Sequence, residues 1–176
     1  MPATAVRPSR SEYDSYYHRY ICLVPDEDVL IALDQQLADT LILLRSLSEQ
    51  HAEFRYEPGK WSVKEVLGHM IDTERIMSYR ALRIARNDRT PIEGFEQDDY
   101  VKYGGFAARS VATLGREFEQ VRRATISLFR NLEPDAWARV GIANKVEISV
   151  RALAYIIAGH ELHHKALLKE RYGLGI

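Results

Sequence analysis

The residues whose types and spacing best suggest chemistry lie near the end of the sequence, in the stretch AGHELHHKALL. His160 and His164 with the intervening Glu161 fit the H-E-x-x-H signature of zinc peptidases, in which the glutamate is the general base. A metzincin would also need a glycine at position 167 and a histidine at position 170, and this sequence has Leu167 and Glu170 there. We therefore interpret the peptidase match as accidental and ask what else this pair of histidines could bind.

The two histidines occupy positions in an apolar helical stripe. The stripe has spacings of four, three, four and three, and it consists of Leu153, Ile157, His160, His164 and Leu167. Positions 160 and 164 are one helical turn apart, so both rings can face a common ion. A pair of hydrogen-bonded core histidines is the alternative, but burying two neutral rings without a partner is costly. A metal site would need a third ligand from another helix.

His69 is the candidate for this third ligand, because it lies close to the inward stripe of another predicted helix. Glu65 at i−4 and Asp72 at i+3 could each accept the spare ring N–H of His69 and orient the ring. Alternatively, Glu65 belongs to a helix cap and Asp72 faces solvent or forms a salt bridge. His18 and His51 have polar neighbours, so we expect them at the surface.

Four stretches have helical periodicity and predict the elements that would position these side chains. They cover about residues 26–48, 62–88, 110–131 and 149–173. Ser62 and Glu65 form an S-x-x-E capping box at the start of the second helix, and Gly173 is a typical helix end. No strand pair is evident. We predict an all-α four-helix bundle with long crossover connections. It forms a single domain over residues 1–176, in which residues 1–10 are a flexible tail.

Composition narrows the class of protein. There are 24 lysines and arginines against 25 acidic residues, and the basic residues are dispersed, so we expect no nucleic-acid partner. No apolar run approaches the ~18 residues of a membrane span, and we expect no membrane partner. Cys22 is the one cysteine, which excludes an intramolecular disulfide and predicts a cytoplasmic location. Because it lies in the apolar run YICLV, we expect Cys22 to be buried.

Several blocks of the sequence together resemble the DinB-like superfamily. They are FRYEPGKWSVKEVLGHMIDTERIMSYRALRIARND with its GKWS helix start and following His69, the loop GFEQDDY, and ALAYIIAGHELHHKALLKERYG. The resemblance extends over nearly the whole chain and is specific in its combination of motifs. It implies a four-helix bundle, often a homodimer, with one divalent metal held by three histidines. Carried over residue by residue, these ligands are His69, His160 and His164, the same three that the spacing favours.

The resemblance also implies a class of activity. The superfamily that this sequence resembles includes enzymes that join a low-molecular-weight thiol, such as bacillithiol or mycothiol, to an electrophile. It also includes a mycothiol-dependent isomerase. Our leading hypothesis is therefore a metal-dependent thiol S-transferase whose partners are such a thiol and a small electrophilic substrate. Zinc or nickel is the expected metal, because imidazole ligands accept either one.

Two other functions stay open at this level. In a non-catalytic, stress-related metal-binding bundle, a fourth protein ligand such as His163 or Glu161 would close the site. A metal-dependent hydrolase would need a general base, for which Asp72 and Glu65 are the catalytic candidates. The aromatic loop over residues 88–106 either covers the site or only caps the bundle, and the tyrosine-rich segment over residues 13–20 is expected to form a short helical arm.

Overall fold

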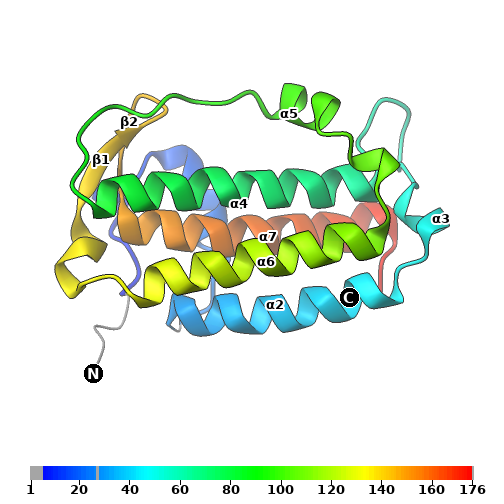
Figure 1. Ribbon diagram of the computed structural model, residues 1–176, viewed down its shortest axis with the longest axis horizontal. Helices are drawn as coiled ribbons and strands as arrows, with labels where there is room; N and C mark the ends of the chain where they lie inside the picture. The colour runs from blue at the N-terminus through cyan, green and yellow to red at the C-terminus, as the bar shows by residue number, and fades with distance from the viewer. Residues whose placement is uncertain (1–5, 27, 176) are drawn as a thin grey trace.

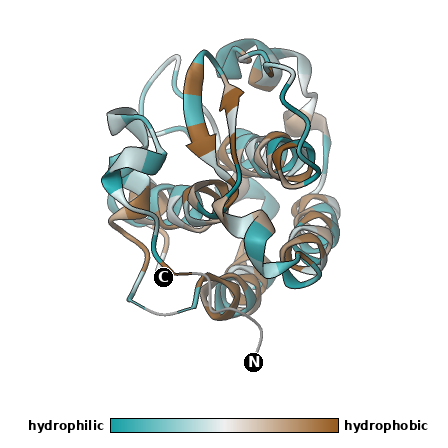
Figure 2. Ribbon diagram, turned by 90° about the vertical axis from the view of Figure 1, so that its left-hand side faces the viewer, coloured by the Kyte–Doolittle hydropathy of each residue, from teal (hydrophilic) through white to brown (hydrophobic). Residues whose placement is uncertain are grey.

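The computed structural model describes residues 6–26 and 28–175 of the chain, and four long helices dominate it (Figure 1). These are α2 (Val29–Ser46), α4 (Val63–Ala85), α6 (Val111–Arg130) and α7 (Val150–Tyr172). The end-on view shows them arranged around a common interior (Figure 2). The predicted all-α four-helix bundle is confirmed, with helix boundaries within three residues of those expected.

A side-chain cap begins each long helix and explains why the helices start where they do. Asp28, Ser62, Ser110 and Ser149 each accept a hydrogen bond from a backbone N–H of the first turn. Such a cap contributes about 1 kcal/mol of helix stability. The capping box of Ser62 and Glu65 forms as predicted. At the other end of the bundle's last helix, Gly173 adopts the left-handed conformation with φ 67°.

The connections determine which helices are neighbours. Helix α4 packs against α6 and α7, and α2 also packs against α6 and α7. Because α4 and α6 run in the same direction, the chain must return along the whole bundle between them (Figure 1). This crossover contains the short helix α5 (Gln97–Tyr103) and the 3-10 turn η3 (Phe106–Ala108). The shorter connection between α2 and α4 contains α3 (Glu49–Ala52).

The expectation that the chain has no strand pair is wrong. Strands β1 (Val140–Ala143) and β2 (Val146–Ser149) form an antiparallel hairpin, preceded by the 3-10 turn η4 (Pro134–Ala138). Asn144 and Lys145 form its turn with φ of 52° and 68°. Each strand has four residues, too few to show clear alternation, and the turn lacks the Asn-Gly signal that predicts such hairpins. Ile92 of the crossover pairs with this hairpin at Ala143.

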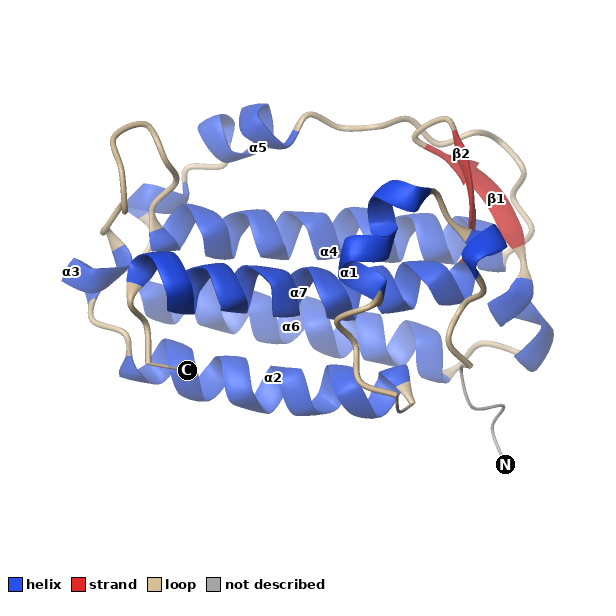
Figure 3. Ribbon diagram, turned by 180° about the vertical axis from the view of Figure 1, so that it is seen from behind, coloured by secondary structure: helices blue, strands red, loops and turns tan. Residues whose placement is uncertain are grey.

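The N-terminal segment packs against the bundle as a short arm (Figure 3). It comprises the 3-10 turns η1 (Arg10–Glu12) and η2 (Ser15–Tyr17) and the helix α1 (His18–Ile21), which lies on α7. Residues 1–5 of the predicted flexible tail lie outside the described residues. In the described part of that tail, the Arg7 side chain donates hydrogen bonds to the carbonyl groups of Ile21 and Val24. Cys22 is exposed, contrary to expectation, because the turn after α1 points it outward.

The interior of the bundle is apolar at both ends and polar in the middle. One apolar cluster contains the first half of α7 and the other contains its last turns. Buried polar side chains from all four long helices lie between the clusters, and we call them the polar belt: Gln36, Thr40, His69, Thr73, Glu74, Arg122, His160, Glu161 and His164. Among the described residues no helix is both long and apolar enough to cross a membrane.

Candidate metal centre

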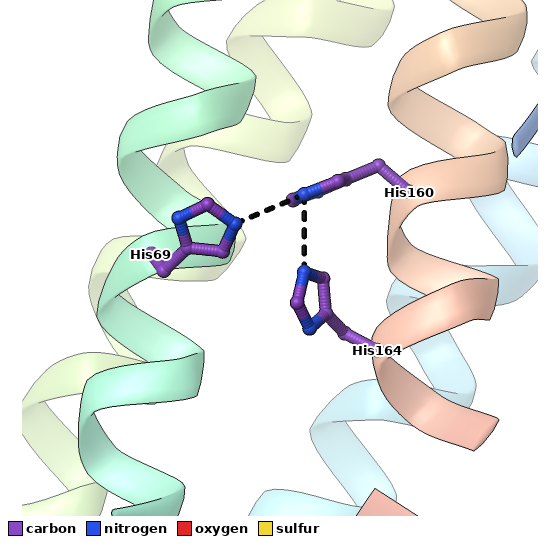
Figure 4. Close-up of side chains that lie close together, drawn as sticks. All are labelled: His69, His160 and His164. Carbon is purple, nitrogen blue, oxygen red and sulfur yellow. Dashed lines mark hydrogen bonds between the residues drawn. The ribbon is translucent and has the colours of Figure 1, made fainter. Parts of the chain in front are cut away.

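The structure brings His69 of α4 together with His160 and His164 of α7 (Figure 4). His69, His160 and His164 are 4%, 7% and 8% exposed, respectively, so the site is inside the bundle. The Nε2 atom of His160 lies 3.1 Å from the Nε2 atom of His69 and 3.1 Å from that of His164. The stripe on α7 and the inward position on α4 therefore converge at one point.

This geometry fits a metal ion better than a set of hydrogen bonds. A ring nitrogen carries either one proton or one lone pair, so the Nε2 atom of His160 cannot satisfy both neighbours through hydrogen bonds. Three imidazole nitrogens bound to one ion at about 2.0–2.1 Å in tetrahedral geometry would be roughly 3.3 Å apart. The observed separations are close to this value. The donor set and its spacing suit a divalent metal.

The protonation of the three rings is also the one that metal binding requires. Burial lowers the pKa of His69 to about 4 and that of His164 to about 3, and it holds the pKa of His160 well below its usual range. The three rings are therefore neutral at pH 7 and can donate lone pairs. Each ring also disfavours protonation of its neighbours, because two buried positive charges would repel.

No fourth protein ligand converges on this point among the described residues. His163 is half-buried and packs against the ring of Tyr20, with ring centroids 5.3 Å apart. Glu161 is buried but points to other partners: it accepts a hydrogen bond of 2.5 Å from Thr40 and forms an ion pair of 2.6 Å with Arg122. Three neutral histidines thus leave at least one coordination position for another ligand.

Neither of the two acidic residues considered as general bases or as partners of His69 bonds the His69 ring in the described part of the chain. Glu65 bonds the backbone N–H of Ser62 in the helix cap and pairs with Arg55. Asp72 is 3.5 Å from Arg75, and burial raises its pKa despite that neighbour. The spare Nδ1 atom of His69 instead lies 3.5 Å from the Thr73 hydroxyl group. The threonine at i+4 therefore takes the orienting role that was predicted for a carboxylate.

A cavity of about 300 Å³ gives access to the site between α4, the arm and the crossover. His69 and His160 line its inner end. Its walls come from three segments that are far apart in sequence, namely the arm with Tyr16, Tyr17 and Tyr20, the crossover with residues 95–97, and the hairpin turn at Asn144. The crossover and the arm therefore do cover the site, one of the two alternatives left open from the sequence. Tyr20 also packs its ring against that of His160, with centroids 5.3 Å apart.

A second cavity, of about 330 Å³, reaches His164 from the other side. Its lining includes Trp61, Tyr172 and Asp98. The ring of Trp61 packs against the His69 ring with centroids 4.9 Å apart. The metal centre is thus flanked by two hollows, one under the arm and the other under the GKWS segment.

A buried ionic cluster, not predicted from the sequence, lies beside His160. Arg122 donates two hydrogen bonds of 2.8 Å to Glu74 and pairs with Glu161, and all three side chains are at most 4% exposed. Burial alone would lower the pKa of Arg122, but the two carboxylates raise it. Both Arg122 and Glu74 stand in apolar stripes of their helices, with Phe118, Arg122, Thr125 and Phe129 at spacings of four, three and four. The same signal that revealed the histidines could therefore have revealed them.

The bundle topology and the three inward histidines define the chain as a metal-site four-helix-bundle protein. Comparison with known families makes this specific, because the model of the DinB superfamily matches residues 32–168. The chain belongs to the DinB superfamily.

Individual relatives agree with this assignment. The chain is 25% identical over 128 residues to the Oceanobacillus iheyensis protein named "Putative metal-dependent hydrolase OB0413", covering 72% of this chain and 73% of that one. Among solved structures, it resembles YfiT from Bacillus subtilis, described as a probable metal-dependent hydrolase with an unusual four-helix bundle topology. The TM-score is 0.70 at 17% identity, over 96% of this chain and 94% of that chain.

A second solved structure with this fold is the mycothiol-dependent maleylpyruvate isomerase, with a TM-score of 0.68 at 12% identity. The match covers 83% of this chain and 61% of that chain. At these identities the two structures show the shared fold and nothing finer.

Proposed function

We propose that the protein is a metal-dependent thiol S-transferase, in which His69, His160 and His164 hold a zinc or nickel ion and a small thiol enters the open position. The observation that carries this proposal is a buried three-histidine centre with an access cavity, while the predicted general bases Glu65 and Asp72 are engaged elsewhere. A bound divalent ion lowers the pKa of a coordinated thiol, so activation of the thiol needs no protein base.

The residues of the chain provide the rest of the site. The three neutral imidazoles leave the charge of the ion undiminished, which favours an anionic ligand. Thr73 orients the His69 ring through Nδ1, and Tyr20 covers the His160 ring. The arm and the crossover narrow the access to the cavity and limit the water that competes with substrate. The electrophile would enter through the same cavity and meet the thiolate sulfur at its inner end.

The first experiment measures metal content in protein purified without a nickel column. We expect about one metal per chain, lost in His69→Ala, His160→Ala and His164→Ala, and retained in the matched control His163→Ala. Cobalt-substituted protein should then develop a thiolate-to-metal absorption band when titrated with small thiols, and the metal-loaded protein should accelerate alkylation of the bound thiol by iodoacetamide. Metal retained in His69→Ala would refute the three-histidine centre. Full metal binding without any thiol band would refute the transferase.

Hydrolysis is the second candidate, favoured by the names of the relatives and by Glu96, an acidic residue in the lining of the access cavity. In that case Glu96 would act as the general base toward water. Ester hydrolysis by the metal-loaded protein, lost in Glu96→Gln with metal content unchanged, would support this reading over the transferase. A non-catalytic bundle would bind metal and show neither reaction.

We also propose a homodimer. Helix α2 exposes two large apolar side chains on its outer face, Ile31 and Ile42, which are 51% and 64% exposed. They are eleven positions apart and therefore point in nearly the same direction. Light scattering of the parent and of an Ile31→Lys/Ile42→Lys variant tests this, since the variant should be a monomer if this face forms the contact.

A further inference from the structure

One wall of the access cavity is a row of side chains along α4. The row begins at the metal centre and consists of His69, Thr73, Met77 and Arg80. Their spacings of four, four and three place them on one face of the helix. The first and last residues are eleven positions apart, so their Cα atoms are separated by about 16 Å along the helix axis. The row therefore extends along the helix, with an imidazole at one end and a guanidinium group at the other.

The guanidinium group of Arg80 is buried without a compensating negative charge. Its side chain is 2% exposed, and among the described residues no carboxylate lies within 4.0 Å of it. Its Nη2 donates to the carbonyl oxygen of Glu93 at 3.0 Å, its Nη1 lies 3.6 Å from the sulfur of Met77, and its Nε has no partner in the described part of the chain.

The other fully buried arginine shows what a balanced environment looks like in this protein. Arg122 has two carboxylate partners, Glu74 and Glu161, and lies in the closed interior of the bundle. Arg80 has neutral partners and lines a cavity. A buried cation with an unused donor costs free energy, and a ligand that supplies the missing negative charge recovers it.

The neighbours of Arg80 favour a small anion over a large or highly charged one. Tyr17 interacts with Arg80, and burial raises the pKa of this tyrosine, so its hydroxyl group stays protonated and can donate a hydrogen bond. The ring of Phe95 lies 6.0 Å from the guanidinium carbon. Because the histidines are neutral, Arg80 is the cationic side chain of the cavity lining, and the acidic lining residue Glu96 is exposed. One planar guanidinium group matches the two oxygens of one carboxylate.

We propose that Arg80, assisted by Tyr17, binds a carboxylate group of the thiol substrate whose sulfur lies at the metal centre. The inference rests on the proposed function, and it adds that the substrate is an elongated thiol carrying a carboxylate far from its sulfur. Thiols with a carboxylate only two or three bonds from the sulfur are too short to reach both ends of the row from His69 to Arg80.

Matched pairs of thiols test this in cobalt-substituted protein, with the thiolate-to-metal band as the readout. The long pair is 6-mercaptohexanoate and 6-mercaptohexanol, and the short pair is 3-mercaptopropionate and 3-mercaptopropanol. We expect the long acid to bind about 10- to 100-fold more tightly than the long alcohol, as for a hydrogen-bonded charge pair. The acids and alcohols of the short pair should bind equally.

Variants assign the preference to Arg80. In Arg80→Gln the long acid and alcohol should bind equally. Arg80→Lys keeps the positive charge and should retain part of the preference, and its folding tests whether the structure tolerates a change at this position. Arg83→Gln is the matched control, because Arg83 lies on the same helix outside the cavity lining and pairs with Asp88. This control should keep the full preference of the parent.

The outcomes separate the inference from the function on which it rests. Equal binding of the long acid and the long alcohol in the parent overturns the Arg80 site and leaves the thiol function standing. If no thiol gives a band, but hexanoate raises the melting temperature of the parent and not of Arg80→Gln, the carboxylate site stands and the thiol function is overturned. If Arg80→Gln keeps the preference for the long acid, another group binds the carboxylate and the proposal is wrong.

Discussion

Arg122 lies 2.6 Å from a carboxylate oxygen of Glu161, and Glu161 directly follows the metal-binding candidate His160 in the chain. Through this contact the ionic cluster joins all four long helices at the level of the histidines, because Thr40 belongs to α2, Glu74 to α4, Arg122 to α6 and Glu161 to α7. With both carboxylates ionised, the cluster has a net charge of −1. A buried negative charge beside the three imidazoles favours a cation between them.

Removing the positive member of this cluster should be strongly destabilising. Arg122→Met would leave two carboxylates buried without a counter-charge, and breaking such a buried pair costs about 3–5 kcal/mol. Urea unfolding of the metal-free protein measures this loss. The adjacent Arg123 is exposed and pairs with the half-buried Glu119, and its change to Met should alter stability by less than about 1 kcal/mol. Similar stabilities for the two variants would show that the cluster does not hold the helices together.

Glu161 should influence the metal without binding it. Glu161→Gln preserves the size of the side chain and can still accept a hydrogen bond from Thr40, but it removes the negative charge next to His160. Substitution of residues next to the metal ligands typically changes metal affinity by about 10- to 100-fold. We therefore expect the variant to retain one metal per chain at saturation with an affinity about 10-fold lower, measured by competition with a chelating dye. Complete loss of metal would instead identify Glu161 as a ligand.

The sequence was sufficient to predict the bundle because its long helices carry regular apolar stripes, serine or aspartate caps and a terminal glycine. The histidine trio could be predicted for a related reason: polar residues in an apolar stripe must find partners inside. The access cavity could not be predicted, because it depends on how Tyr20 of the arm and Asn144 of the hairpin come to line one hollow beside α4. Thr73 could not be singled out in the sequence, because a threonine one turn from a histidine is common and its hydroxyl group carries no charge that marks it as a partner.

Lowering the pH should destabilise the metal-free protein through its histidines. Burial lowers the pKa of His69 to about 4 and of His164 to about 3, whereas both titrate near 6.5 in the unfolded chain. Between pH 6.5 and pH 4 the unfolded state binds more protons at these rings than the folded state does. Their contribution to stability is therefore constant above pH 6.5 and falls as the pH decreases toward 4. At pH 5 the loss is on the order of 2 kcal/mol per ring.

Urea unfolding in the presence of a chelator at pH 8, 6.5 and 5 measures this dependence. His69→Leu removes one of the three buried rings, so its stability should fall less steeply below pH 6.5 than that of the parent. Stability that stays unchanged from pH 7 to pH 5 in the parent would contradict neutral, buried imidazoles in the metal-free state.

The arm is held to the bundle at a point where only glycine fits. A Cβ atom on Gly159 of α7 would lie 2.1 Å from the backbone oxygen of Tyr20, and backbone cannot move aside as a flexible side chain can. Gly159→Ala should therefore displace the arm and lower stability by about 1–3 kcal/mol, although alanine is the better helix former. Because Tyr20 covers His160 and lines the access cavity, we also expect weaker thiol binding in cobalt-substituted protein.

Gly115→Ala in α6 is the matched control, since its Cβ would meet Leu44 at 3.5 Å, an ordinary contact, and this change should leave stability equal or higher. If Gly159→Ala melts and binds thiols like the parent, the arm does not form the wall of the site.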